Sequence, residues 1–245
     1  MLVEQTLEKL YALKLHGMAE AWQEQRQQAR SAELSFDDRL ALLVERQWLW
    51  KENRALAARL QYAGLKQTAC VEDIDFRHPR GLPRPLVEQL ATCDWVRQHR
   101  ACLITGPTGT GKSYLACALA HTACRAGFRA LYYYVPKLFR QLAQAQAEGS
   151  LTRLLKKLRG VDLLLVDDWG LTPVQPDQYH LFLEILEDRH GSGATLMTSQ
   201  YPVDSWHQLV GDPTVSDAIL DRLVHSAYRL ELTGESMRRK QAKAA

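Results

Sequence analysis

The sequence contains the segment Gly106-Pro107-Thr108-Gly109-Thr110-Gly111-Lys112-Ser113, which matches the pattern G-x-x-x-x-G-K-[ST] at every fixed position. Glycine lets consecutive backbone N–H groups turn inward, where they form a cradle for phosphate. The lysine supplies a positive charge for the β- and γ-phosphates, and the hydroxyl that follows is a ligand for Mg²⁺. We therefore predict that the whole segment binds ATP, that Lys112 also acts in catalysis, and that Ser113 holds Mg²⁺.

The residues on either side of this segment support the same interpretation. An apolar strand, Cys102–Thr105, comes directly before it, and a helix is expected from Lys112 to about Arg125. The positive N-terminal end of that helix would face the phosphates. A chance glycine-rich turn would lack this strand–loop–helix context, so the pattern predicts a phosphate-binding loop.

A second motif, Leu163-Leu164-Leu165-Val166-Asp167-Asp168, is an apolar run that ends in two carboxylates. A phosphate-binding loop requires an acidic residue at the end of a buried strand, because Mg²⁺ must be held opposite the hydroxyl. We predict that Asp167 holds Mg²⁺, through water, and that Asp168 polarises the attacking water. Taken alone, the run also fits an ordinary strand followed by a turn, and we expect Trp169-Gly170 to be a turn without a chemical role.

From Ala101 onward, short apolar runs alternate with longer helical stretches. This alternation predicts an α/β fold, in which a parallel five-stranded sheet is covered by helices on both faces. We place this core at residues 101–235. Strands are expected at 102–105, 129–135, 161–166, 194–199 and 227–232, and helices at 112–125, 136–147, 150–159, 176–190 and 214–225.

The rest of the chain reads as a helical N-terminal domain (1–68), a connector (69–100) and a basic C-terminal tail (236–245). Apolar residues from Leu7 to Trp22 recur at three- and four-residue steps, which predicts one apolar helix face. Ser35 is expected to cap a second helix that ends near Gly64. In the connector, prolines and a glycine between His78 and Pro85 break any regular period.

Composition excludes several classes of protein. The 245 residues are 46% hydrophobic and 24% charged, as in ordinary globular proteins and unlike disordered or collagen-like chains. The net charge of +3 (31 basic minus 28 acidic residues) does not by itself indicate a nucleic-acid partner. Apolar runs are too short for a membrane span, and Glu4 and Glu8 do not fit a signal peptide, so we expect a cytoplasmic protein without a membrane partner. The five cysteines lack a CxxC pair and are expected to be reduced core residues.

Taken together, these motifs resemble the IstB-like ATP-binding proteins that accompany insertion-sequence transposases. That family lies in the initiator-type clade of the AAA+ ATPases, which also holds bacterial helicase loaders. The resemblance is carried by GPTGTGKS, by LLLVDDWG, by Asp217-Ala218-Ile219-Leu220-Asp221-Arg222-Leu223-Val224-His225 and by the ending Gly234–Arg238. It implies an AAA+ P-loop core that uses ATP and Mg²⁺.

The resemblance also implies roles for residues outside the two motifs. Gln200 occupies the first sensor position, where it would contact the γ-phosphate or the attacking water; the alternative is a polar strand end. Arg222 falls where this class places an arginine finger that reaches the nucleotide of a neighbouring subunit. The alternative is a surface arginine paired with Asp221 or Glu231. Arg238 is a candidate second sensor, although the lid that normally carries this residue has no room in the chain.

In the same clade, an insertion before the acidic strand meets DNA, and residues 136–159 lengthen that connection here. Its leucines, at 151, 154, 155 and 158, define one helix face, and the cations lie off this face. The alternative is an ordinary solvated helix face. The predicted DNA contacts are Arg153, Lys156, Lys157 and Arg159, extended by Lys137 and Arg140.

The function implied by the resemblance is that of an ATP-dependent transposition helper. Such a protein would form a helical or ring-like homo-oligomer on double-stranded DNA, select or prepare the target, and recruit and stimulate the cognate transposase. Asp168 replaces the usual glutamate and is one methylene shorter, so slow ATP hydrolysis that DNA or a partner stimulates is expected. The alternatives are a replicative helicase loader, whose N-terminal helices grip the helicase, and a small-molecule kinase.

Overall fold

The computed structural model describes residues 2–28, 33–172, 174–225 and 227–237. The chain divides into two compact units, Met1–Ala58 and Arg59–Ala245. Arg238, the candidate second sensor, and the remainder of the basic tail lie outside the described residues.

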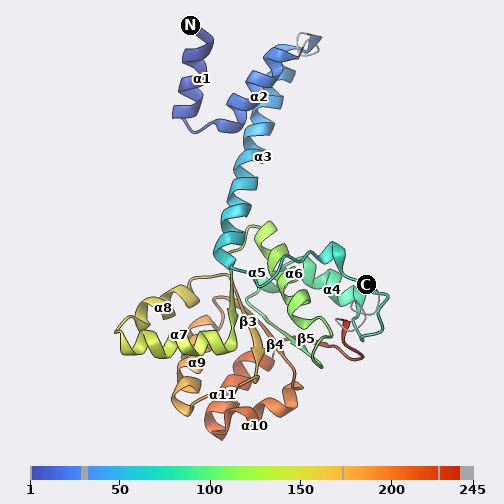
Figure 1. The fold of residues 1–245 in the computed structure, drawn as a ribbon, viewed down its shortest axis with the longest axis vertical. Coiled ribbons are helices and arrows are strands. Elements are labelled where there is room, and N and C mark those ends of the chain that lie inside the picture. Colours follow the sequence, from blue (N-terminus) through green and yellow to red (C-terminus); the bar gives the residue numbers. More distant parts are fainter. Residues whose placement is uncertain (1, 29–32, 173, 226, 238–245) are drawn as a thin grey trace. The chain divides into compact units, whose positions relative to one another are not determined.

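The second unit is built on a five-stranded parallel sheet in the order β2-β3-β4-β1-β5 (Figure 1), which confirms the predicted α/β fold. β4 lies between β1 and β3 and pairs with both, so the phosphate-binding loop after β1 and the acidic pair on β3 come to the same edge of the sheet. The strands are β1 (Ala101–Thr105), β2 (Ala130–Tyr134), β3 (Leu163–Trp169), β4 (Ala194–Ser199) and β5 (Tyr228–Glu231).

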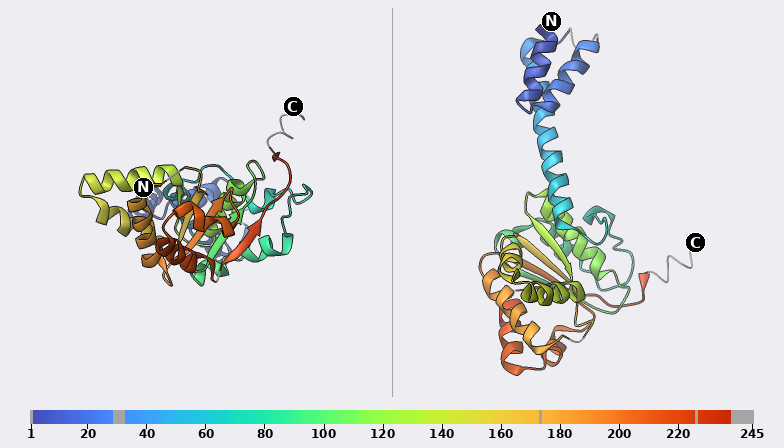
Figure 2. Two further views of the ribbon diagram at one scale, coloured as in Figure 1. Left: turned by 90° about the horizontal axis from the view of Figure 1, so that it is seen from below. Right: turned by 60° about the vertical axis from the view of Figure 1, so that its left-hand side comes forward.

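Helices cover both faces of this sheet (Figures 1 and 2). α6 (Lys112–Arg125) packs along the strands on one face, and α4 (Arg84–Ala91) packs against α6. On the other face, alternate strand residues such as Leu103, Leu164 and Met197 join an apolar core with side chains of the remaining helices. These are α7 (Val135–Ala147), α8 (Leu151–Arg159), α9 (Pro176–Arg189), α10 (Trp206–Val210) and α11 (Pro213–Val224).

The structure differs from the sequence analysis at three places in this unit. The connector (69–100) also contains regular structure, as α4, α5 (Asp94–Arg97) and a 3₁₀ turn, because a proline fits the first turn of α4 and its apolar residues face α6. α10 was not anticipated after β4. Trp169 belongs to β3 rather than to a turn, since its buried ring stacks on Phe182 with centroids 4.8 Å apart.

The first unit contains α1 (Leu2–Ala12), α2 (His16–Gln27) and most of α3 (Phe36–Ala63). The apolar period from Leu7 to Trp22 is interrupted, because Lys14 adopts a left-handed conformation with φ of 61°. Leu15 N then donates to Leu10 O over 2.8 Å, which closes the end of α1. The cap predicted for α3 is present: Asp38 N donates to Ser35 Oγ over 3.2 Å.

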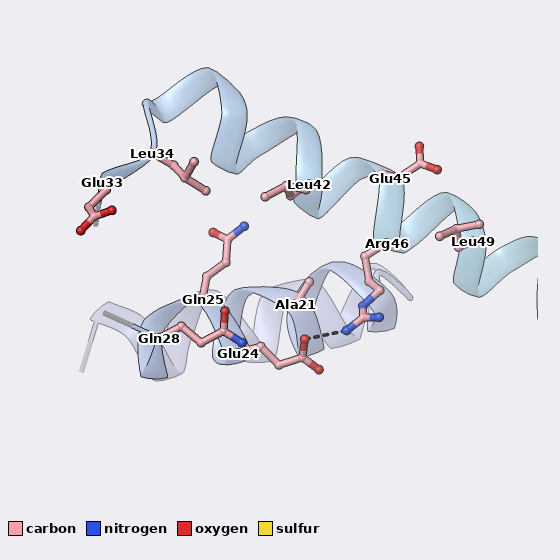
Figure 3. A pocket seen from close by; sticks show the side chains of 10 residues that line it. All are labelled: Ala21, Glu24, Gln25, Gln28, Glu33, Leu34, Leu42, Glu45, Arg46 and Leu49. Carbon is pink, nitrogen blue, oxygen red and sulfur yellow. Dashed lines mark hydrogen bonds and ion pairs between the residues drawn. The ribbon is translucent and has the colours of Figure 1, made fainter. Parts of the chain in front are cut away.

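Within this unit, α2 packs directly on α3. A Cβ atom on Gly17 would lie 2.7 Å from Trp50 Cβ, so the close approach depends on glycine. Glu24 and Arg46 form an ion pair of 2.6 Å beside a groove between the two helices (Figure 3). Large apolar side chains on α3 remain exposed at four-residue steps, namely Phe36, Leu40, Val44 and Trp48. Among the described residues, no helix combines the length and apolar content that a membrane span needs.

Candidate functional site

The predicted phosphate-binding loop connects β1 to α6, which begins at Lys112. Gly106 and Gly109 have φ angles of 140° and 87°, which L side chains rarely adopt. A Cβ atom would lie 2.1 Å from Leu232 O in the first case and 2.1 Å from Ser236 Oγ in the second. The loop thus keeps its open backbone because glycine both permits the conformation and leaves room for the segment that crosses it.

The chain after β5 runs over this loop and is tied to it by backbone hydrogen bonds. Met237 N donates to Gly109 O over 2.9 Å. Beneath the same segment, the Arg80 guanidinium donates to Thr110 O over 3.0 Å, and Thr233 N donates to Arg80 O over 2.9 Å. Burial lowers the pKa of Arg80. Sequence analysis missed Arg80, which lies in the segment that was expected to be an irregular connector.

The Lys112 side chain is buried against the phosphate-binding loop itself. Its Nζ donates to Gly106 O over 2.7 Å and to Pro107 O over 2.9 Å. The positive charge therefore lies at the backbone of the predicted anion cradle, at the N-terminal end of α6, where phosphate oxygens would be received.

Asp167 and Ser113 meet at the end of β3. Ser113 Oγ donates to Asp167 Oδ1 over 2.8 Å, and Thr198 Oγ1 donates to the same oxygen over 2.7 Å. Tyr132 OH donates to Asp167 Oδ2 over 2.8 Å. The carboxylate is fully buried, so these donors compensate for its lost hydration and fix its orientation. The roles of Tyr132 and Thr198 were not predicted, since neither carries a motif.

Asp168 turns toward the same place as Asp167. Neighbouring strand residues normally point to opposite faces of a sheet. Here β3 and β4 shift register between Val166 and Trp169, and Asp168 has a left-handed φ of 65°, held by a 2.9 Å hydrogen bond from its N to Thr198 Oγ1. Burial, and then the charge of Asp167, raise the pKa of Asp168.

A lysine from the N-terminal side of the core completes this cluster. Lys66 Nζ lies 3.2 Å from Asp167 Oδ2 and 3.7 Å from Asp168 Oδ2, and 5.5 Å from the centroid of the Tyr134 ring. Burial by itself lowers the pKa of Lys66, but the charge and hydrogen bond of Asp167 outweigh it, so the pKa is raised. Sequence analysis did not single out this residue.

A cavity of about 710 Å³ opens over these groups, a volume suited to a nucleotide. Thr108 Oγ1 donates to Gln200 Oε1 over 2.8 Å across its rim, which brings the predicted sensor to the phosphate-binding loop. The predicted residues that line the cavity are Thr108, Gly109, Gly111, Lys112, Ser113, Asp168 and Gln200.

Hard oxygen ligands at the base of the cavity fit a magnesium ion. Ser113 Oγ and Asp167 Oδ1 lie 2.8 Å apart, the arrangement expected where a hydroxyl and a carboxylate share one cation and phosphate and water supply its other ligands. Among the described residues, no group of three or more histidine, cysteine, aspartate and glutamate side chains forms a metal site made by protein alone.

Arg222 does not line the cavity of its own chain. It lies on α11, where it forms ion pairs with Glu187, at 2.9 Å, and with Asp221. The surface pair with Asp221 that was the alternative is thus present, and Glu187 rather than Glu231 supplies the second carboxylate.

The predicted DNA-binding cations lie on the surface of α7 and α8. Leu158 is buried and the other leucines of α8 pack against the apolar core, as their spacing predicts. The side chains that remain exposed are Arg153, Lys156, Lys157, Arg159, Lys137 and Arg140. Among the described residues, none of these cations forms an ion pair with a carboxylate, and Lys157 Nζ lies 5.8 Å from the centroid of the Tyr62 ring.

A family model described as IstB-like ATP binding protein matches residues 8–245. The chain belongs to this family. Protein y4pL of Sinorhizobium fredii (strain NBRC 101917 / NGR234), whose name describes an insertion sequence ATP-binding protein, is 50% identical over 241 residues, which are 98% of each chain. The IstB-like chain is therefore an ATP-binding protein of the insertion-sequence class, as its motifs indicated.

Solved structures share the fold of the IstB-like core. A crystal structure of DnaI has a TM-score of 0.59 and 24% identity, and the match covers 67% of this chain and 91% of that one. The replication initiator DnaA bound to AMPPCP and single-stranded DNA has a TM-score of 0.58 and 18% identity, with 74% and 56% covered. These likenesses show that the core shares the α/β fold of both proteins.

Proposed function

We propose that this IstB-like protein is a magnesium-dependent ATPase that assembles on double-stranded DNA in the cytoplasm and helps a transposase. The observation that carries the proposal is the 2.8 Å contact between Ser113 and Asp167, which joins the two nucleotide motifs in one site of an insertion-sequence family member. Residues 1–68 would serve as a docking domain for DNA or a partner.

Each side chain of the site has a role that follows from its position. Lys112 would bind the β- and γ-phosphates, since its ammonium lies at the loop backbone. Ser113 and Asp167 would hold Mg²⁺, which supplies positive charge to the phosphates. Asp168 would accept a proton from the attacking water, and Gln200, held by Thr108, would orient that water or the γ-phosphate.

Arg222 would complete the site of a neighbouring subunit. It lies outside its own cavity and is partly exposed on α11, so it can serve in trans only if it exchanges Glu187 and Asp221 for phosphate. ATP would then bind the assembled form more tightly than the free chain, and this difference in affinity would drive assembly. Slow hydrolysis through the short Asp168 side chain would set the lifetime of the oligomer.

The exposed cations of α7 and α8 would bind the phosphates of the duplex. Their contacts would be independent of base sequence and sensitive to salt, because each neutralised phosphate releases counterions. Assembly on DNA and recruitment of the transposase would together direct transposition to the DNA on which the ATP-bound oligomer has assembled.

The second candidate is a helicase loader, and the exposed stripe Phe36, Leu40, Val44 and Trp48 on α3 favours it, because an adaptor needs an apolar surface for its partner. Copurification separates the two functions: a transposition helper retains transposase, and a loader retains the replicative helicase. A small-molecule kinase would instead hydrolyse or transfer phosphate at a rate that duplex DNA does not change.

The decisive experiment combines sedimentation and electron microscopy of the protein on a long duplex, with and without a non-hydrolysable ATP analogue. We expect large nucleoprotein assemblies with the analogue and loss of these assemblies in Lys112→Ala. Arg229→Ala, which changes an exposed arginine of β5, is the matched control and should assemble normally. If Lys112→Ala assembles on DNA as the parent does, or if the parent remains monomeric, the proposal is wrong.

A further inference from the structure

Lys66 is a charged residue of the site that the proposed mechanism does not use. It follows α3 in the sequence, and its ammonium lies 3.2 Å and 3.7 Å from one oxygen of each member of the acidic pair, Asp167 and Asp168. Its side chain is 42% exposed, whereas that of Asp167 is fully buried. The cation thus reaches the carboxylates from the solvent side of the cavity.

The acidic pair needs a positive charge at this point. Two neighbouring carboxylates repel each other, and one of them has no access to water. The hydrogen bonds from Ser113, Thr198 and Tyr132 satisfy Asp167 as an acceptor but bring no formal charge. Lys66 brings a full positive charge to both carboxylates, and its ammonium also lies 5.5 Å from the centroid of the Tyr134 ring.

We propose that Lys66 is a built-in competitor of Mg²⁺: its ammonium occupies the cation position beside Asp167 and Asp168 until the metal–nucleotide complex displaces it. This inference rests on the proposed function, which assigns Mg²⁺ to Ser113 and Asp167. Mg²⁺ held by Ser113 Oγ and Asp167 Oδ1 would lie close to the ammonium at Oδ2 of the same carboxylate, and the two cations repel each other, so metal binding favours release of the lysine. Lys66 can leave because its flexible stem is already partly in water.

Displacement has a thermodynamic consequence that can be measured. Lys66 lowers the apparent affinity for the metal complex of the nucleotide but does not lower the affinity for metal-free nucleotide, since it does not compete with the phosphates. A competing partly exposed ion pair changes such an affinity by about fivefold.

The test is calorimetric titration with ADP, once in excess Mg²⁺ and once in EDTA, on the full chain. In Lys66→Met we expect affinity in Mg²⁺ to rise about fivefold and affinity in EDTA to stay unchanged. Lys66→Arg should resemble the parent because it keeps the charge, and Lys51→Met, on the exposed surface of α3, should have no effect. The midpoint of thermal unfolding in EDTA without nucleotide should fall for Lys66→Met, and Mg²⁺ should raise it more than in the parent.

Three results would overturn the inference. Unchanged affinity in Mg²⁺ would show that the ammonium does not compete with the metal. A loss of affinity in Mg²⁺ and in EDTA alike would show that Lys66 contacts the phosphates instead. If ADP binding by the parent itself is indifferent to Mg²⁺, the proposed magnesium site fails, and this inference fails with it.

Discussion

The hydroxyl of Ser113 donates to Asp167 Oδ1 over 2.8 Å, although one residue opens α6 and the other lies on β3. The contact is possible because β4 alone separates β1 from β3 in the sheet, so the two motifs reach the same edge. A cation held by one of these oxygens is within reach of the other.

Ser113→Ala and Asp167→Asn are expected to act on one magnesium site. Each change should weaken ADP binding in Mg²⁺ by about tenfold or more and change binding in EDTA little. The affinity of the double variant for ADP in Mg²⁺ should be little lower than that of the weaker-binding single variant, because both side chains hold the same ion. Calorimetry measures these affinities, and Thr122→Ala, which removes another hydroxyl from α6, is the control. Additive losses would contradict a shared site.

Arg222→Ala should slow ATP hydrolysis by about 10³-fold if the guanidinium reaches the nucleotide of a neighbour. Because that role is in trans, a mixture with the equally inactive Lys112→Ala should recover part of the activity. A mixed interface has an intact loop and an intact arginine when the Arg222→Ala subunit supplies the loop and the Lys112→Ala subunit supplies the arginine. Arg229→Ala, on the exposed side of β5, should retain full activity. An Arg222→Ala protein that hydrolyses ATP normally would remove this residue from the mechanism.

Glutamine substitution at all of the α8 cations should weaken duplex binding and flatten its salt dependence. The slope of log K against log salt should fall by about 0.9 for each phosphate contact that is lost. Fluorescence anisotropy at several salt concentrations gives this slope. Arg229→Gln, which removes an exposed charge from β5, is the control and should leave the slope unchanged. An unchanged slope in the α8 variant would show that these cations do not contact DNA and form an ordinary solvated helix face.

Arg189 is a buried cation with a structural task, and its side chain is only 1% exposed. It donates to Leu158 O and Val161 O over 2.7 and 2.9 Å and also to Ala194 O, and burial lowers its pKa to about 10. Arg189→Met would leave these carbonyl groups without donors, so we expect the free energy of unfolding to fall by about 3–5 kcal/mol. Urea unfolding measures this loss. The exposed Arg153→Met is the control, and equal midpoints would refute the assignment.

Cysteine reactivity should follow burial. Cys102 is fully buried, which raises its pKa to about 12, so about one thiol in 10⁴ is ionised at pH 8. Burial also raises the pKa of Cys93, Cys117 and Cys124. Iodoacetamide at pH 8 should therefore modify the half-buried Cys70 first and the others only after unfolding in urea. Mass spectrometry after brief labelling decides this, and rapid modification of Cys102 in the native protein would contradict it.

The sequence was sufficient for the sheet and for the strand–loop–helix context of the predicted phosphate-binding loop, because both depend on local signals. Short apolar runs mark the strands, and the loop needs glycine and lysine at fixed spacing. The surroundings of Asp167 needed the structure. Lys66, Tyr132 and Thr198 reach it from three separate segments, and none of them carries a pattern that periodicity detects.

Departures from regular backbone geometry also could not be predicted from the sequence. Alternation along a regular strand would point the side chains of Asp168 and Asp167 to opposite faces of the sheet. The left-handed backbone at Asp168 changes the direction of its side chain, and because the residue is not glycine the sequence gives no sign of this conformation. Lys14 ends α1 in the same way without a helix-breaking residue. The structure brings Asp168 and Gln200 to the cavity, while their chemical roles, like that of Arg222, stay predictions.

The backbone bond from Met237 to Gly109 has a practical consequence for anyone who handles this protein. We expect a purification tag, fluorophore or fusion partner joined to the chain after Met237 to disturb this bond and the segment that crosses the predicted phosphate-binding loop. Such a label would perturb nucleotide affinity while leaving the protein folded. A fluorescent probe attached at that end is expected to respond to nucleotide binding.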